Sequence, residues 1–276
     1  MANSPPIKVI AIVFAYVLGI YGQAIKPEVR VSSVAKFDGK TNEGLGIDFS
    51  PNGKYFLLVD KEGTRSVWNT TTQTLRYSLN KKSKVAYFSN DEKSLFIPSK
   101  KGSQIIDAES GKITAILDRN IAPWREAWSS DDSYVAAWIG NFTVGIFDAQ
   151  SGKLKQSFVA HQKKKLAIQR FFDFAGDLTL QFTPDSKGLL TSTGDTEAEL
   201  WDVETGKLLF TFSQAIRSPY MGALPKLPEV TDAKISPDGK WIFTCGYDDA
   251  SLWDASTGKL LQHFEGSGFA METWRE

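Results

Sequence analysis

The 276-residue sequence contains one cysteine, Cys245, and two histidines, His161 and His263. A single cysteine excludes an intrachain disulfide and a zinc site made of cysteines. We interpret Cys245 as a small buried strand residue; the alternative is a reactive thiol or an intermolecular disulfide. The two histidines lie far apart in the chain, and we interpret both as structural residues, not as metal ligands or catalytic bases.

The sequence also lacks a net charge, because its 32 basic side chains balance its 32 acidic ones. No global field would attract nucleic acid or an anionic membrane surface, so we expect no nucleic-acid partner. Hydrophobic residues make up 42% of the chain, including 8 Trp and 18 Phe. That is ample for a core and argues against a disordered chain.

No apolar run reaches the roughly 20 residues that a membrane-spanning helix needs. Near the N-terminus, Lys8 precedes an apolar run over residues 9–21, and the small residues Gly22 and Ala24 follow it. This layout predicts a secretory signal peptide over residues 1–24, or an uncleaved anchor that would be the only link to a membrane. The alternative is a buried N-terminal element. With 25–30 as a linker, we expect residues 31–276 outside the cytoplasmic membrane, secreted or periplasmic.

Recognisable catalytic motifs are missing as well. No serine stands in a nucleophile-elbow motif, no glycine-rich phosphate loop opens a helix, and no segment reads as a convincing helix. The aspartate pairs at 131–132 and 248–249 lack the spaced oxygen ligands of a calcium loop, so we interpret them as turn residues. The sequence therefore predicts a protein that is not an enzyme and that carries no cofactor or metal.

A repeat is the strongest positive signal. A five-residue turn motif recurs at spacings of about 40 residues in the first half of the chain and about 54 in the second. Its copies stand at 50–54, 89–93, 129–133, 183–187 and 236–240. Each copy is followed by a pair of one hydrophobic and one polar residue: Trp68-Asn69, Ile106-Asp107, Phe147-Asp148, Trp201-Asp202 and Trp253-Asp254. A Ser/Thr-Gly-Lys turn then follows at 110–112, 151–153, 205–207 and 257–259, whereas the first repeat has lost its glycine.

Each motif has a mechanical reason. Proline fixes φ, aspartate bonds the local backbone and glycine accepts positive φ, so the first motif predicts a tight turn between two strands. Residues 47–49 and 54–59 alternate as strands do, the Trp-Asp pair ends a third strand, and residues 207–212 read as a fourth. We expect the residue that ends each first strand in the core, where its burial contributes about 1.5–3 kcal/mol. These residues are Phe49, Phe88, Trp128, Phe182 and Ile235.

The turn at 236–240, the Trp253-Asp254 pair and the Thr-Gly-Lys turn at 257–259 resemble the repeats of WD-repeat β-propellers, and the resemblance covers about residues 37–264. It implies an all-β fold, a β-propeller of four-stranded antiparallel blades. The Gly-His pair that opens many such repeats is absent, and only Ala160-His161 comes close. The buried His–Asp–Trp network of the family is therefore expected to be mostly missing, with Asp195 and Asp248 or Asp249 as remnants. This divergence resembles the bacterial branch of the family.

We count five full repeats plus a partial sixth. The expected blades cover about 38–79, 80–117, 118–158, 159–212 and 213–264. Residues 31–37 read as a further fourth strand and 267–274 as a further first strand, which is half a blade. Either the ring closes with five blades, or the chain is a partial propeller whose missing strands come from elsewhere. Because unpaired edges invite pairing with another chain, we expect self-association or a required partner.

The loops predict a candidate partner-binding face. In a propeller, the loop into the first strand and the loop between the second and third strands open on one face. The basic group there comprises Lys81, Lys82, Lys84, Lys100, Lys101, Lys163, Lys164 and Lys165. The acidic group comprises Asp195, Glu197, Glu199, Asp248 and Asp249. Tyr220 joins the face from an insert at 214–229, and a second insert covers 160–177. The alternative is solvated lysines and loops that pack on their own blade.

The remaining repeat residues are interpreted as structural: Trp68, Asp107, Asp148, Trp201, Asp202, Trp253 and Asp254. The resemblance implies a protein-binding or scaffolding module. Two alternatives stay open. The Asp-Ala-x-Ser/Thr-Gly-Lys runs also resemble quinone-dependent dehydrogenase blades, although Phe158, Phe210 and Phe264 stand where those carry Trp. The second alternative is a fragment of a larger sensor whose other blades are lost.

Overall fold

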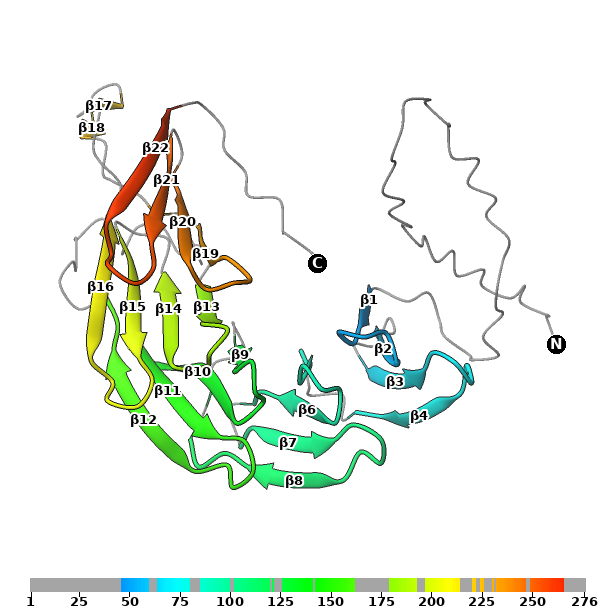
Figure 1. Cartoon of the computed structure of the whole chain (residues 1–276). Helices are drawn as coiled ribbons and strands as arrows, with labels where there is room; N and C mark the ends of the chain where they lie inside the picture. Colours follow the sequence, from blue (N-terminus) through cyan, green and yellow to red (C-terminus); the bar gives the residue numbers. More distant parts are fainter. Residues whose placement is uncertain are drawn as a thin grey trace, which may run out of the picture. The chain divides into compact units, whose positions relative to one another are not determined.

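The computed structural model describes residues 46–59, 64–79, 85–99, 102–119, 121, 126–140, 142–161, 179–192, 197–213, 220–221, 224–225, 230, 232–246 and 249–265. Within these ranges every regular element is a β-strand and none is a helix. The chain divides into two compact units, Met1–Lys81 and Lys82–Glu276, and each is described by itself (Figure 1).

The first unit contains one four-stranded antiparallel sheet in the order β1-β2-β3-β4. Its strands are β1 (Gly46–Phe49), β2 (Tyr55–Val59), β3 (Arg65–Asn69) and β4 (Leu75–Ser78). Phe56 pairs with Trp68 in register, and their rings stack with centroids 6.1 Å apart. Together with Leu58 they form the buried core of this blade.

The second unit contains four sheets of the same plan, each antiparallel and each ordered as the chain runs. The first has β5 (Tyr87–Phe88), β6 (Ser94–Ile97), β7 (Gln104–Asp107) and β8 (Ile113–Ile116). The next has β9 (Glu126–Trp128), β10 (Tyr134–Gly140), β11 (Thr143–Asp148) and β12 (Leu154–Val159). The third has β13 (Thr179–Phe182), β14 (Gly188–Ser192), β15 (Glu197–Asp202) and β16 (Leu208–Ser213). The last has β19 (Asp232–Ile235), β20 (Trp241–Cys245), β21 (Asp249–Asp254) and β22 (Leu260–Glu265).

These five sheets confirm the predicted all-β fold of five four-stranded antiparallel blades, which we number one to five in chain order. The expected partial sixth blade falls on 31–37 and 267–274, outside the described residues. The insert at 214–229 contains a two-stranded ribbon of β17 (Tyr220–Met221) and β18 (Leu224–Pro225).

Successive blades of the second unit pack face to face through shared hydrophobic clusters. An aromatic residue on the fourth strand of one blade meets the tryptophan on the third strand of the next. Phe158 stacks on Trp201 with ring centroids 4.3 Å apart, and Phe212 meets Trp253 edge-on at 5.5 Å. Each blade thus covers apolar surface that a single four-stranded sheet would leave in water.

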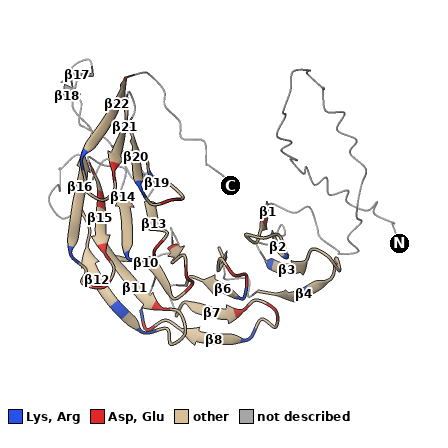
Figure 2. Cartoon of the chain, viewed as in Figure 1, with Lys and Arg blue, Asp and Glu red and all other residues tan. Residues whose placement is uncertain are grey.

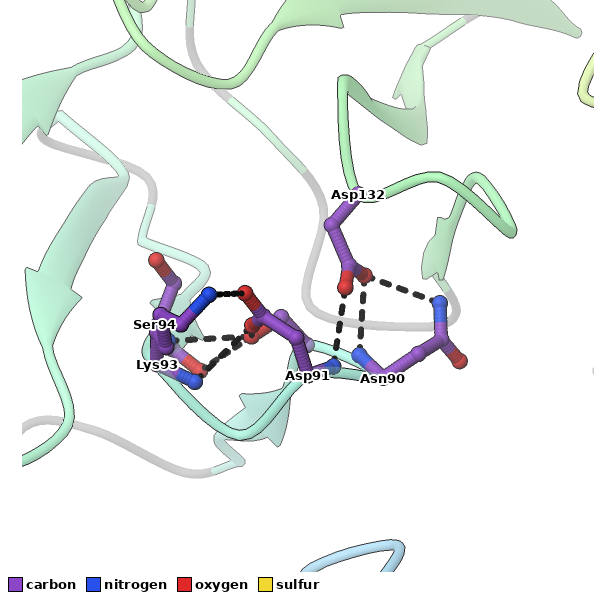
Figure 3. A network of polar contacts seen from close by, with 6 residues as sticks. Asn90, Asp91, Lys93, Ser94 and Asp132 are labelled. Carbon is purple, nitrogen blue, oxygen red and sulfur yellow. Dashed lines mark hydrogen bonds and ion pairs between the residues drawn. The ribbon is translucent and has the colours of Figure 1, made fainter.

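Within the second unit, the turns between first and second strands contact one another across neighbouring blades at one end of the sheets, which we call the turn end. The fourth residue of every turn has positive φ, although only two of the five are glycine: Gly53, Glu92, Asp132, Ser186 and Gly239. In blade three, Asp132 Oδ1 accepts hydrogen bonds from the backbone N and the side-chain Nδ2 of Asn90 in blade two, each at 2.8 Å. Its Oδ2 accepts a third from the backbone N of Asp91, also at 2.8 Å (Figure 3).

The same junction is built differently between blades four and five. There the second turn residue is Pro184, which has no N–H to donate. The facing fourth residue is Gly239, and a Cβ added to it would lie 3.3 Å from Pro184 Cδ. Between blades two and three, the donors of Asn90 thus face the carboxylate of Asp132. Between blades four and five, the ring of Pro184 faces Gly239.

The Ser/Thr-Gly-Lys turns bring a second contact between blades. Gly152 has φ +72, and a Cβ there would lie 2.4 Å from the backbone O of Ile116 in blade two. Gly258 has φ +68, and its Cβ would lie 2.5 Å from Phe210 Cδ1 in blade four. Glycine is therefore required at each of these positions for two reasons: the backbone is left-handed, and the preceding blade approaches closely.

The residues that end the first strands are not all in the core. Phe182 and Ile235 are buried as predicted, and Phe88 and Trp128 are half-buried. Phe49, however, is 60% exposed, so that part of the prediction is wrong. In blades four and five, the sheet face that holds the equivalent residue is covered by the preceding blade. In the first unit, no described strand covers Phe49.

Candidate protein-binding surface

The aspartate of the Trp-Asp pair serves the turn that follows it. Asp202 Oδ1 accepts hydrogen bonds from the backbone N and the hydroxyl Oγ1 of Thr205, both at 2.7 Å. These bonds hold the pKa of the Asp202 carboxyl below its ordinary value. The equivalent Asp107, Asp148 and Asp254 make the same bonds to the serine or threonine three residues on. In the first blade Asn69 replaces the aspartate and accepts from Thr72 in the same way.

The opposite end of the sheets, which we call the loop end, carries the connections into the first strand and between the second and third strands. In blade four a buried polar network reaches it. Trp201 Nε1 donates to Thr191 Oγ1 at 3.1 Å, and Thr191 Oγ1 donates to the backbone O of Glu199 at 3.4 Å. The ring Nε2 of His161 lies 3.1 Å from the same hydroxyl. Since that hydroxyl has one hydrogen, it accepts from both rings, which places a hydrogen on His161 Nε2.

Glu199 closes this network. Its Oε2 accepts from the backbone N of His161 at 2.9 Å and lies 3.6 Å from His161 Nε2. The side chains of His161 and Glu199 are only 2% and 9% exposed. Blade four therefore retains a buried histidine–tryptophan network, with Glu199 as its acidic member. A threonine on the second strand links histidine to tryptophan, and no single sequence motif displays that link. Glu199, expected on the acidic face, is instead buried.

Blade five has the tryptophan half of this arrangement. Trp253 Nε1 donates to Thr244 Oγ1 at 2.9 Å. The other histidine, His263, lies on β22 with its Nδ1 3.0 Å from Ser251 Oγ and its Nε2 3.9 Å from Asp249 Oδ2. Ser251 is 2% exposed, so this Ser–His–Asp grouping has no surface at which a substrate could meet the hydroxyl.

Polar side chains also join the first strands of blades four and five along their length. Thr179 Oγ1 donates to Asp232 Oδ1 at 2.9 Å, and the backbone N of Ile235 donates to Gln181 Oε1 at 3.0 Å. Cys245 is buried in β20, as predicted. Burial, followed by the nearby carboxylates of Asp232 and Asp249, raises the pKa of its thiol to about 11. The thiol is therefore protonated at neutral pH and is a poor nucleophile.

Of the twelve buried polar or charged residues in the described ranges, seven lie in blades four and five: Thr179, Ser186, Thr191, Ser192, Glu199, Thr244 and Ser251. In Figure 2 the charged residues lie mostly in the turns and near the strand ends, and the middles of the strands are mostly uncharged. At the loop end of these two blades the described charged residues are acidic, as at Glu197, Asp232 and Asp249.

Most of the predicted partner-binding residues lie outside the described ranges. These are Lys81, Lys82, Lys84, Lys100, Lys101, Lys163, Lys164 and Lys165, together with Asp195 and Asp248 of the acidic group. Tyr220 lies in β17, where the backbone is described. Among the residues with described positions, no three His, Cys, Asp or Glu side chains are grouped to hold a metal ion.

The predicted signal or anchor over 1–24 and the linker over 25–30 also lie outside the described residues. The part of the chain that the structure describes contains no helix long and apolar enough to span a membrane.

Comparison with known proteins places these blades in context. The family described as WD40, "WD domain, G-beta repeat", matches residues 225–254, which end at the Trp253-Asp254 pair. Mouse apoptotic protease-activating factor 1 is 23% identical over 221 residues, covering 79% of this chain and 16% of the relative. The human protein of the same name is 24% identical over 181 residues, covering 65% and 13%. The chain thus spans less than a fifth of the length of these relatives.

Among solved structures, the C-terminal WD40 domain of Sif2 is similar with a TM-score of 0.57 and 14% sequence identity. The alignment covers 82% of this chain and 58% of that one. Identity at this level establishes the fold and no more. The repeated sheets, their turn motifs and these similarities together show that the chain has the fold of a WD40-repeat propeller.

Proposed function

We propose that this protein is a non-catalytic binding or scaffolding propeller, and that a protein partner contacts the loop end of blades four and five. WD40 propellers generally act by binding other proteins and are generally not catalytic. The mouse relative is named for activating an apoptotic protease, which supports a protein partner in general terms. No partner follows from that name for this chain.

The contrast between the two ends of the sheets carries the proposal. At the turn end, neighbouring blades are hydrogen-bonded to one another through Asn90, Asp91 and Asp132. They also approach closely at Gly152 and Gly258. At the loop end, the same sheets present polar side chains and the longest connections, between Val159 and Thr179 and between Ser213 and Asp232. A rigid scaffold that positions variable loops is the usual arrangement of a binding surface.

The basic group in the longest of these connections provides the test. We would replace Lys163, Lys164 and Lys165 with glutamate in the full chain. The partner would be captured by the tagged protein, with contacts mapped by crosslinking and mass spectrometry. We expect the charge reversal to remove the partner and its crosslinks, because like charges across an interface disfavour binding.

The matched control reverses three exposed lysines at the turn end, Lys153, Lys207 and Lys259. It changes net charge by the same amount and should keep the partner. A partner retained by the loop-end variant would overturn the proposed surface, and equal loss in both variants would show binding through net charge alone.

We further propose that the protein acts outside the cytoplasmic membrane, secreted or held by its N-terminal segment. The support is the pattern of Lys8, the apolar run at 9–21, and Gly22 and Ala24. N-terminal sequencing of the protein from the extracytoplasmic fraction should begin at residue 25 if the signal is cleaved. Recovery only from the cytoplasmic fraction would overturn this location.

A further inference from the structure

The turn between the first two strands of blade one differs from its four equivalents at the third residue. The other four turns carry an aspartate there: Asp91, Asp131, Asp185 and Asp238. Blade one has Asn52 at this position, and Gly53 follows it in the only Asn-Gly pair of the sequence. The turn at 50–54 lies wholly within the first unit. Blade one therefore carries an amide where the other repeats carry an acid.

The aspartate makes the same two hydrogen bonds in each of the four turns. Its Oδ1 accepts from the hydroxyl of the first turn residue and from the backbone N of the fifth. In blade five the donors are Ser236 Oγ at 2.7 Å and the backbone N of Lys240 at 3.1 Å, and the acceptor is Asp238. The turn of blade one has donors of the same kind, the hydroxyl of Ser50 and the backbone N of Lys54. An aspartate at position 52 would thus find the partners that its equivalents have.

The surroundings of Asn52 leave its amide open to attack by the chain itself. Asn52 is exposed, and a Cβ added to Gly53 would meet no atom within 4 Å. A glycine at residue 53 thus leaves its own backbone N accessible to the Asn52 side chain. That nitrogen donates to the backbone O of Ser50 at 2.9 Å, so the turn must open briefly before the nitrogen can react. Exposed turns open locally at low cost in free energy.

We propose that Asn52 is a deamidation site, and that the reaction converts the turn of blade one to the acidic form of the other four. The backbone N of Gly53 attacks Asn52 Cγ and forms a new C–N bond. The amide nitrogen leaves as ammonia and takes the proton of the Gly53 N–H. Water then opens the resulting succinimide: cleavage at Cγ gives aspartate, and cleavage at the main-chain carbonyl gives isoaspartate. Asparagine is among the thermolabile residues, and water is the only co-reactant.

The folded turn favours the aspartate product. Isoaspartate adds one carbon to the main chain between residues 52 and 53, which disturbs the bond from Gly53 to Ser50 and the register that pairs Phe49 with Phe56. Aspartate leaves the main chain unchanged. In blade five, the hydrogen bonds from Ser236 and then Lys240 lower the pKa of the aspartate at this turn position to about 2. The same donors would keep the new acid ionised, and an ionised carboxylate does not close again to the succinimide.

Asn90, the second residue of the turn in blade two, is a control within the same chain. Its Nδ2 donates to the backbone O of Ser129 at 2.9 Å and to Asp132 Oδ1 at 2.8 Å. The residue after it is Asp91, whose side chain hinders the backbone N that would attack. Both hydrogen bonds must break before this amide can react, which slows the reaction by about tenfold or more.

The test follows deamidation of the full chain at mildly alkaline pH, in native buffer and in denaturant. Peptide mapping by mass spectrometry, with fragmentation that separates aspartate from isoaspartate, would give the rate and product at each site. In the native chain we expect Asn52 to lose its amide at least about tenfold faster than Asn90 and to yield mainly aspartate. In denaturant we expect more isoaspartate at position 52. The Asp238-Gly239 pair should form no isoaspartate in the native chain.

Two variants complete the experiment. Asn52→Asp makes the product directly, and its thermal midpoint at neutral pH should be no lower than that of the wild type. Asn52→Gln keeps an amide on a longer side chain, which would have to close a six-membered ring, so this variant should keep its amide under the same conditions.

Four results would overturn the proposal. One is a native Asn52 that remains an amide when the chain in denaturant is fully converted. Equal rates at Asn52 and Asn90 would show that the turn has no special reactivity. Isoaspartate as the main native product, or an Asn52→Asp variant that melts below the wild type, would show that the turn of blade one does not hold the acid.

Discussion

The junction between blades two and three can be rebuilt in the form used between blades four and five. The change replaces Asn90 with proline and Asp132 with glycine, which copies the pairing of Pro184 with Gly239. Proline fits the second turn position, because the sequence already has it there in three of its five turns. The prediction concerns the coupling between the two substitutions, measured as a difference in the free energy of unfolding.

The size of each effect follows from the bonds that are lost. Asp132→Gly removes a carboxylate that accepts three hydrogen bonds of 2.8 Å. Hydrogen bonds to charged groups contribute about 1.5–3 kcal/mol each when shielded, and solvent at this exposed turn reduces the three together to about 2–3. Glycine is more stable than aspartate at positive φ by about 1 kcal/mol, so the net loss in the free energy of unfolding is about 1–2 kcal/mol. Asn90→Pro removes two of the three bonds, together with the bond from Asn90 Nδ2 to the backbone O of Ser129, and should cost about as much.

In the double variant neither the donors of Asn90 nor the carboxylate of Asp132 remain, so neither is left without the other; only the backbone N of Asp91 loses its acceptor, at a turn open to solvent. We therefore expect a loss about 1–2 kcal/mol smaller than the sum of the two single losses. Urea unfolding followed by tryptophan fluorescence would measure it. Trp128 Nε1 donates to the backbone O of Tyr87 across the same junction, at 3.2 Å, so its emission reports separation of these blades.

A third variant separates the backbone from the hydrogen bonds. Asp132→Ala loses the same bonds as Asp132→Gly but keeps a Cβ at φ 57°, so it should be less stable by about 1 kcal/mol. Strictly additive losses for Asn90→Pro and Asp132→Gly would refute the claim that the two positions form one contact.

Four further predictions concern single residues. Thr191→Val removes the hydroxyl that accepts from Trp201 and should cost about 1–3 kcal/mol in the free energy of unfolding. Hydrogen bonds from Ser236 and then Lys240 lower the pKa of Asp238 from 3.8 to about 2, so its stabilisation is complete above about pH 4 and is lost toward pH 2; the thermal midpoint of Asp238→Asn should fall less over that range. The Cys245 thiol should react with an alkylating reagent at pH 8 far more slowly in the native protein than in denaturant. Gly152→Ala should destabilise the protein by more than the roughly 1 kcal/mol expected of Gly53→Ala, because only Gly152 faces backbone within 3 Å.

Much of the fold follows from interactions between residues close in the sequence. Asp202 meets Thr205 three residues on, and Asp238 meets Ser236 two residues back. Such contacts need a fixed spacing, and a fixed spacing repeats visibly along a chain. The turns, the order of four strands and the number of complete blades could therefore be predicted from the sequence alone.

The contacts between blades could not be predicted in the same way. Asp132 bonds Asn90, 42 residues earlier, and the same turn position is filled elsewhere by Gly, Glu or Ser. The partner of each side chain depends on how two separate turns come to face each other, and no local pattern records that. For the same reason, no sequence motif predicts the link from His161 through Thr191 to Trp201.

The sequence by itself determined that each repeat folds as a four-stranded sheet, because alternation and turn chemistry act within about ten residues. Only the tertiary structure decided which apolar faces are covered. Phe212 and Phe264 stand at equivalent positions of equivalent strands, yet one is buried and the other is 38% exposed. Burial is a property of what lies opposite a side chain, and a repeated sequence presents the same residue whether or not a neighbour follows.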